Sequence, residues 1–211
     1  MTRIRSFSST HPSFIGARCI NKEWFKVPIY EVWDIFCDHL YWVGHAYEIK
    51  IHAFVLMNNH FHLLVSTPNG NLSQAMQYLM RESSLDITKH AGRINQTYGA
   101  PYFSSLIETD HAFKHVYKYL YRNPVDAGLV RNAEDYKFST LNESLGGVKA
   151  QIPLAEDALL FPHTEQTLEW INTPYPESFR EEFQKASRRN KFKFPSRRGS
   201  RKLSPWNSQL S

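Results

Sequence analysis

The chain has 211 residues and a formal net charge of +5, and 42% of its residues are hydrophobic. This length accommodates one compact domain with an appendage, and the hydrophobic content excludes a chain that is disordered throughout. Because there are only two cysteines and no apolar run of the roughly 20 residues that span a bilayer, we exclude a disulfide scaffold and a membrane-spanning chain, and expect a cytoplasmic protein.

The hydrophobic pattern predicts four strands and three helices. Short apolar runs indicate strands, whereas apolar residues that recur every three or four positions indicate amphipathic helices. We expect strands at 14–20, 49–57, 61–65 and 102–108, and helices at 28–41, 71–87 and 109–123. Asn58 and Asn59 predict a tight hairpin turn, and Pro124 predicts the end of the third helix. This order is typical of a ferredoxin-like α+β sandwich, an antiparallel sheet with helices on one face, followed by one extra helix.

Two histidines, His60 and His62, flank Phe61 at the third predicted strand. Because strand side chains alternate between faces, the two imidazoles point to the same side of the sheet. Two neutral imidazoles side by side form half of a metal site. For an isolated pair of this kind, two solvent-facing histidines bonded to water are the alternative interpretation.

The third predicted helix carries Tyr119 and Asn123 one turn apart. At about 100° per residue, both lie at the edge of the apolar stripe and face the sheet, whereas Tyr121 points into solvent. Tyr119 is thus a tyrosine that faces the protein body beside a polar side chain. The alternative interpretation is a structural tyrosine, with Asn123 capping the helix before a proline.

The basic residues are concentrated at the C-terminal end. Nine of the 25 lysines and arginines lie between 185 and 202, and the rest of the chain has 16 basic and 20 acidic residues. Mobile positive charge suits phosphate contacts, and neighbouring aromatic rings can stack on unpaired bases. A solubilising tail is the alternative interpretation. The candidate DNA-binding residues are Lys185, Arg188, Arg189, Lys191, Lys193, Arg197, Arg198, Arg201 and Lys202.

Two longer motifs resemble a known family. The stretch HAFVLMNNHFHLLVSTPNGNLSQAM is similar to the histidine core of the single-tyrosine HUH transposases, and KYLYRNPVDAGLV resembles their tyrosine signature. The resemblance is closest to the REP-associated tyrosine transposases of the insertion-sequence-200-like group, and it extends over 12–138. One departure lies at 100–105, where family members commonly carry a basic segment and this chain reads APYFSS.

The resemblance implies roles for individual residues. It makes His60 and His62 the ligands of a divalent metal ion, Tyr119 the nucleophile, and Asn123 the polar residue that completes the metal site. We expect Mg²⁺ or Mn²⁺; magnesium prefers oxygen ligands, and a site with two histidines suits manganese better.

The implied activity is metal-dependent cleavage and rejoining of DNA through a 5′-phosphotyrosine intermediate. The expected partner is single-stranded DNA with a hairpin, in transposition or in the processing of repeated palindromes, which places the protein at the nucleoid. Two alternatives stay open: a non-catalytic DNA-binding regulator, and an HUH nuclease of the replication or relaxase type. The sequence does not decide between a monomer and a homodimer.

The predicted organisation has four parts. A flexible leader at 1–11 precedes the catalytic domain at 12–138. An extension of undefined fold follows at 139–184, and the basic tail occupies 185–211.

Overall fold

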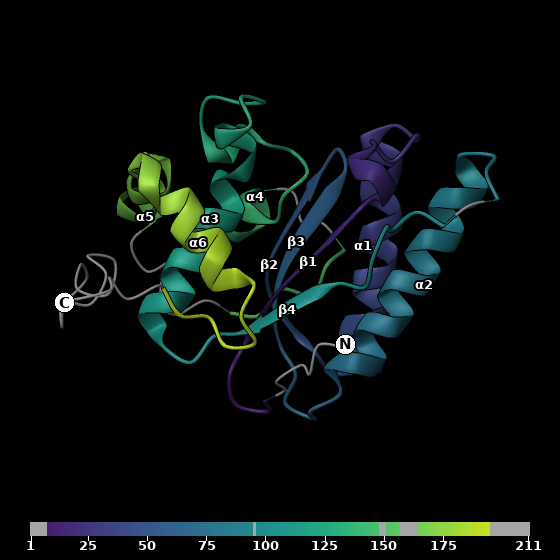
Figure 1. Cartoon of the computed structure of the whole chain (residues 1–211), viewed down its shortest axis with the longest axis horizontal. Coiled ribbons are helices and arrows are strands. Elements are labelled where there is room, and N and C mark those ends of the chain that lie inside the picture. Colours follow the sequence, from purple (N-terminus) through teal and green to yellow (C-terminus); the bar gives the residue numbers. More distant parts are fainter. Residues whose placement is uncertain (1–7, 95, 148–150, 157–163, 195–211) are drawn as a thin grey trace.

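The structure is a computed structural model that describes residues 8–94, 96–147, 151–156 and 164–194. Within these residues, a four-stranded antiparallel sheet has the strand order β2-β3-β1-β4 (Figure 1). The strands are β1 (Ser13–Arg18), β2 (Lys50–Met57), β3 (His60–Ser66) and β4 (Phe103–Leu106). This is the order of a ferredoxin-like sandwich, so the predicted fold class is confirmed.

The helices follow the predicted sequence order and continue beyond it. None of those in the described part of the chain is long and apolar enough to cross a membrane. They are α1 (Ile29–Ala46), α2 (Leu72–His90), α3 (Asp110–Asp126), α4 (Leu141–Ser144), α5 (Thr164–Asn172) and α6 (Glu177–Ser187), with 3₁₀ turns η1 (Ile20–Lys22) and η2 (Ala133–Asp135).

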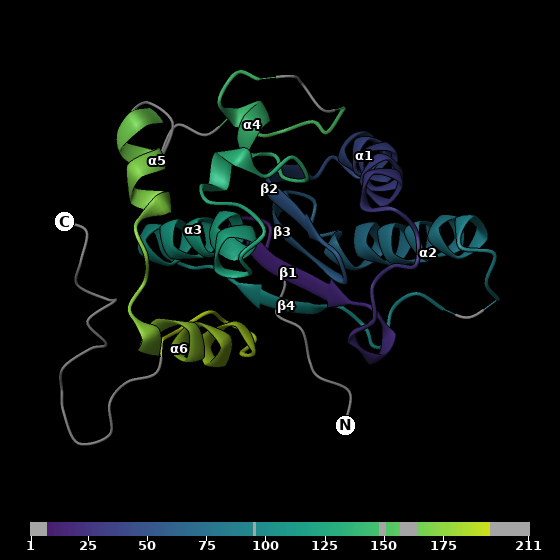
Figure 2. The ribbon, with the colours of Figure 1, turned by 90° about the horizontal axis from the view of Figure 1, so that it is seen from above.

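Helices cover both faces of the sheet (Figure 2). On one face, α1 and α2 pack over Ile15 and Phe61. On the opposite face, α3 packs over Phe14 and Leu64. Neighbouring strand residues point to opposite faces, which is why Phe14 and Ile15 belong to two different cores. The sequence predicted helices on one face of the sheet. α1 and α2 form that layer, and α3 forms a second layer on the opposite face.

The third helix passes the proline that was expected to end it. Pro124 lies inside α3, which continues to Asp126. Proline has no backbone N–H, so it removes the hydrogen bond to the carbonyl four residues earlier. Because Pro124 lies only two residues before the end of α3, the helix loses little by including it. The chain leaves the helix at Gly128, whose φ of +71° is the left-handed conformation that favours glycine. At the other end, Thr109 caps the helix, since its hydroxyl oxygen accepts a hydrogen bond from the backbone of Ala112 at 3.1 Å.

The prediction that Tyr121 points into solvent is wrong. Its side chain is 1% exposed, and its hydroxyl lies 2.9 Å from Oγ1 of Thr140. Thr140 is in turn bonded to the backbone of Phe54 in β2. The segment before α4 therefore covers a face of α3 that the helical pattern alone assigned to water.

The C-terminal extension packs on α3 and on the edge of the sheet. Arg122 of α3 donates hydrogen bonds to Asp126 and to the carbonyls that end α5. After α6, the backbone of Phe192 donates to Leu106 of β4 at 2.8 Å. The sequence suggested that aromatic rings in this region stack on bases. Phe192 and Phe194 are both buried, so neither ring is free to do so. α6 also crosses the boundary expected between 184 and 185.

Candidate active site

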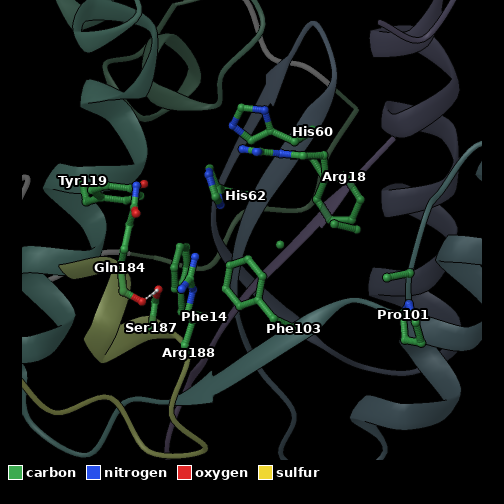
Figure 3. Close-up of a pocket in the computed structure, with 14 residues that line it drawn as sticks. Phe14, Arg18, His60, His62, Pro101, Phe103, Tyr119, Gln184, Ser187 and Arg188 are labelled. Atoms are coloured by element: carbon green, nitrogen blue, oxygen red, sulfur yellow. Dashed lines mark hydrogen bonds between the residues drawn. The ribbon is translucent and has the colours of Figure 1, made fainter. Parts of the chain in front are cut away.

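The structure brings the four predicted site residues together on the α3 side of the sheet. His60 and His62 project from β3 with ring centroids 5.0 Å apart. The Tyr119 ring of α3 lies 5.8 Å from that of His62 (Figure 3). Asn123, one turn later, donates a hydrogen bond to the backbone carbonyl of Tyr119 at 3.4 Å, and its side chain lies close enough to act on the pKa of both Tyr119 and His60. Asn123 therefore links the tyrosine to the histidine pair.

Both histidines are held neutral. Burial lowers the pKa of His60 to about 4, with a further contribution from the positive charge of Arg18. Burial also holds the pKa of His62 well below its usual range, helped by His60 and Arg18. At neutral pH both rings therefore have the uncharged form that can donate a lone pair to a metal ion.

The tautomer of His60 is set by its neighbour in the hairpin turn. Oδ1 of Asn59 lies 2.7 Å from Nδ1 of His60, and the Asn59 amide nitrogen donates to the carbonyl of Lys22. Because Oδ1 can only accept, Nδ1 of His60 carries the proton and Nε2 holds the lone pair. This is the orientation that a second partner commonly imposes on a metal-binding histidine.

The residues present fit a weakly held divalent ion. Nδ1 of His62 is buried and has no hydrogen-bond partner among the described residues. His60 and His62 supply two nitrogen donors, and a bound ion would replace Asn123 as the partner of Nε2 of His60, with the Asn123 amide oxygen as the third donor. No group of three His, Cys, Asp or Glu side chains capable of holding a metal occurs in the described residues. This donor set suits Mn²⁺ better than Mg²⁺ and leaves the remaining positions to water and substrate.

A glycine in β1 makes room for the histidine pair. Gly16 is the cross-strand partner of His62. A Cβ atom at this position would lie 2.4 Å from the ring of Phe103 and 3.0 Å from Nδ1 of His62. Only glycine allows β1, β4 and the His62 ring to approach so closely.

His60, His62 and Tyr119 line a cavity of about 420 Å³ that the extension helps to enclose. Gln184 and Ser187 of α6, and Arg188 directly after it, form one wall of this cavity, which we call the catalytic pocket (Figure 3). The ring of Phe183 stacks on Tyr119 at 3.7 Å between centroids and 14° between planes. α6 therefore holds the orientation of the tyrosine ring, which the sequence did not indicate.

An arginine that the sequence did not single out also faces the pocket. Arg18 at the end of β1 pairs with His60 across the strands, and its positive charge lowers the pKa values of His60, His62 and Tyr119. Its strand neighbours on this face are Phe14 and Gly16, so the alternation rule would have placed it here once the β1–β3 register was known.

Burial is the largest influence on Tyr119 and raises its pKa. Hydrogen bonding from Asn123 and the positive charges of Arg180 and Arg18 act in the opposite direction. A phenol with a raised pKa is a weak nucleophile at neutral pH. Asn123 of α3, Arg180 of α6 and Arg18 of β1 each favour the phenolate. An anion formed at Tyr119 would therefore be stabilised from three elements.

The predicted basic residues divide into four groups. Arg188 lines the pocket. Lys185 and Lys191 form ion pairs with Glu181 and Glu108, while Arg189 and Lys193 lie near the chain end of the described part. Those that lie outside the described residues are Arg197, Arg198, Arg201 and Lys202.

Comparison with known proteins gives consistent matches. Residues 20–123 match the family model described as "Transposase IS200 like". A REP-associated tyrosine transposase of Escherichia coli (strain K12) is 25% identical over 119 residues, which are 56% of this chain and 70% of that protein. A solved structure of a REP-associated tyrosine transposase bound to a REP hairpin superposes with a TM-score of 0.59 at 19% identity, over 76% of this chain and 94% of the other. At that identity, the superposition supports the fold alone.

Proposed function

The chain belongs, through residues 20–123, to the IS200-like transposase family, and we propose that it cleaves and rejoins single-stranded DNA with Tyr119 as the nucleophile. The family match confirms the resemblance of the two sequence motifs. The observation that carries the proposal is the convergence of Tyr119, His60 and His62 in one cavity, with Asn123 close enough to act on the pKa of both Tyr119 and His60.

The charge around the cavity suits a phosphodiester. Arg18 and Arg188 line it, and Arg180 lies close enough to act on the pKa of Tyr119. Among the described residues that line it, no side chain is acidic. A cavity with positive charge and no negative charge favours the negatively charged backbone of a nucleic acid.

The reaction is a transesterification. The phenolic oxygen of Tyr119 forms a bond to the phosphorus, and the bond from phosphorus to the 3′-oxygen of the strand breaks. Over the whole step, one proton passes from the phenol to the leaving 3′-oxygen, so a 5′-phosphotyrosine and a free 3′-hydroxyl result. The reverse reaction with another 3′-hydroxyl rejoins the strand, because the ester bond is conserved in the intermediate.

The chain's own residues would prepare this step. Phe183 holds the Tyr119 ring, Asn123 orients its hydroxyl, and Arg18 would contact the phosphate oxygens. His60, His62 and Asn123 would hold a divalent ion. Such an ion, when bound, neutralises charge on the non-bridging oxygens and orients the phosphate.

The proposed substrate is a DNA strand that contains a hairpin. One structural relative is a REP-associated tyrosine transposase bound to a REP hairpin. A nucleophile inside a cavity reaches a phosphate only in a strand that can bend into it, and this favours unpaired DNA next to a hairpin stem. The proposed process is transposition, or the processing of repeated palindromes.

The test is a search for the covalent intermediate. Labelled DNA hairpins from inverted repeats beside the gene are incubated with the protein and Mn²⁺ or Mg²⁺, then separated on a denaturing gel. We expect a slowly migrating protein–DNA adduct that forms only with the metal ion. Tight binding of these hairpins without any adduct would contradict the proposed reaction.

One observation favours a second candidate, a DNA-binding regulator without cleavage activity. Phe183 covers one side of Tyr119, and burial raises the tyrosine pKa. A regulator would bind hairpins through the same surface and form no adduct under any metal condition. The same gel therefore distinguishes the two candidates.

The tail makes a separate contribution that truncation can measure. A cut after Glu182 would remove Phe183, Phe192 and Phe194 from the core, so the proper cut is after Phe194. We expect this truncation to leave the melting temperature unchanged and to weaken hairpin binding. Because each lost contact with duplex phosphate changes the salt slope by about 0.9, losing four basic residues should flatten it by about 3 to 4. An unchanged salt slope in fluorescence-anisotropy titrations would exclude residues 195–211 as a phosphate contact.

A further inference from the structure

A second, larger hollow begins at the edge of the catalytic pocket. This groove has a volume of about 1020 Å³ and runs along α2, beside the segment that returns the chain from α2 to β4. Ala100 and Pro101 line both the groove and the catalytic pocket. Pro101 lies on the side of the catalytic pocket that faces α2 (Figure 3). The two hollows therefore meet at 100–101, which we call the shared rim.

The groove carries positive charge only. Arg81 and Lys89 line it from α2, and Arg93 lines it from the following segment, whereas no acidic side chain is among the described residues that line it. Arg81 pairs with Glu82, which does not line the groove, and an exposed pair of this kind contributes little energy. Asp86, the other nearby acid of α2, is bonded to His39 of α1. The groove thus complements a polyanion.

The groove also presents apolar side chains to solvent. Leu85 is 51% exposed and Ile94 is 100% exposed, although both are large hydrophobic residues. Met76, Met80 and Tyr102 line the same hollow. A mixture of flexible or aromatic apolar side chains with separated cations is suited to a single strand, whose bases contact the apolar surface while its phosphates contact the cations.

We propose that the unpaired strand next to the scissile phosphate leaves the catalytic pocket over the shared rim and lies in the α2 groove. The inference rests on the proposed function and adds the path of the substrate strand. In this path, Arg81, Lys89 and Arg93 contact phosphates, and Leu85 and Ile94 contact bases. Residues 100–105 contain no basic side chain, and Arg81, Lys89 and Arg93 supply the positive charge beside this segment.

The experiment compares binding of two DNA probes by fluorescence anisotropy in the Tyr119→Phe background. One probe is a labelled hairpin, and the other is the same hairpin with single-stranded oligothymidine flanks of about 10 nucleotides. The test variant combines Arg81→Gln, Lys89→Gln and Arg93→Gln. We expect it to lose at least about tenfold in affinity for the flanked probe and to flatten the salt slope by about 2. Affinity for the unflanked hairpin should be unchanged.

The matched control carries the same change of charge on other surfaces. It combines Lys50→Gln, Arg131→Gln and Lys137→Gln, three exposed positions that line neither the groove nor the catalytic pocket. A second test variant, Leu85→Ser with Ile94→Ser, should weaken binding of the flanked probe and leave the salt slope unchanged.

Two results would overturn the inference. One is equal binding of the flanked probe by the groove triple variant and the control. The other is a change in oligomeric mass of the groove variants with unaltered DNA affinity, which would assign the groove to a second copy of the chain. If the groove variants lose flank binding while the protein with Tyr119 forms no adduct, the path stands and the proposed cleavage fails.

Discussion

Tyr119→Phe should abolish formation of the protein–DNA adduct while leaving hairpin binding and the fold intact. The substitution removes one oxygen atom, which is the atom that would bond to phosphorus. Loss of a covalent nucleophile costs at least about 10³-fold in rate. The phenylalanine ring can keep the stacking contact with Phe183 and the edge contact with Phe14. We therefore expect the free energy of unfolding to change by no more than about 1 kcal/mol.

The matched control is Tyr121→Phe, two residues further along the same helix. Its hydroxyl is buried and bonded to Thr140, and Tyr121 does not line the catalytic pocket. This variant should lose about 1 kcal/mol of stability and form adduct at the rate of the unmodified protein. Adduct formation by Tyr119→Phe, measured on the same gel with the same hairpin, would contradict the assignment of the nucleophile.

The sequence predicted most of the sheet and its helices because their signals are local. The turn at Asn58 and Asn59 forms the expected hairpin, and strand alternation placed His60 and His62 on one face. Helical spacing placed Tyr119 and Asn123 towards that same face, where their side chains meet the histidines. The core of the site was thus predictable from periodicity and from the two family motifs.

The missing parts of the site come from contacts between distant segments. Phe183 reaches Tyr119, and Arg188 reaches the catalytic pocket, because α6 packs against α3; no pattern near residue 183 indicates this partner. Tyr121 was assigned to solvent for the same reason, since Thr140 covers it from outside the helix. Arg18 needed the β1–β3 register, which depends on which strands pair and not on either strand alone.

The C-terminal extension therefore packs as one unit with the helix that carries Tyr119. Arg122 binds the last turn of α3 to the end of α5, and the stack of Phe183 on Tyr119 binds the middle of α3 to α6. The proposed nucleophile is itself the second of these two attachment points. Changes at the attachments would alter the position of Tyr119 without touching the histidines.

His60→Ala should abolish binding of the metal ion and strongly reduce adduct formation. The substitution deletes the imidazole whose Nε2 would bind the ion, and it removes the ring on which the Asn123 side chain acts. A metal ion contributes several kcal/mol to transition-state stabilisation in sites of this kind, so we expect a loss of about 10²-fold or more in adduct formation. Titration with Mn²⁺, followed by electron paramagnetic resonance, should show no bound ion in the variant.

The control for this variant is His45→Ala, which removes an exposed histidine at the end of α1. Its ring contacts only the carbonyl and ring of Tyr41 among the contacts described for it, and it lines none of the pockets described here. Mn²⁺ binding and adduct yield should both equal those of the unmodified protein. If His60→Ala retains normal yield and the same dependence on Mn²⁺, then His60 is not a ligand. The charge on the phosphate would then have to be balanced by Arg18 and the arginines of α6, which makes Arg18→Gln the next variant to measure.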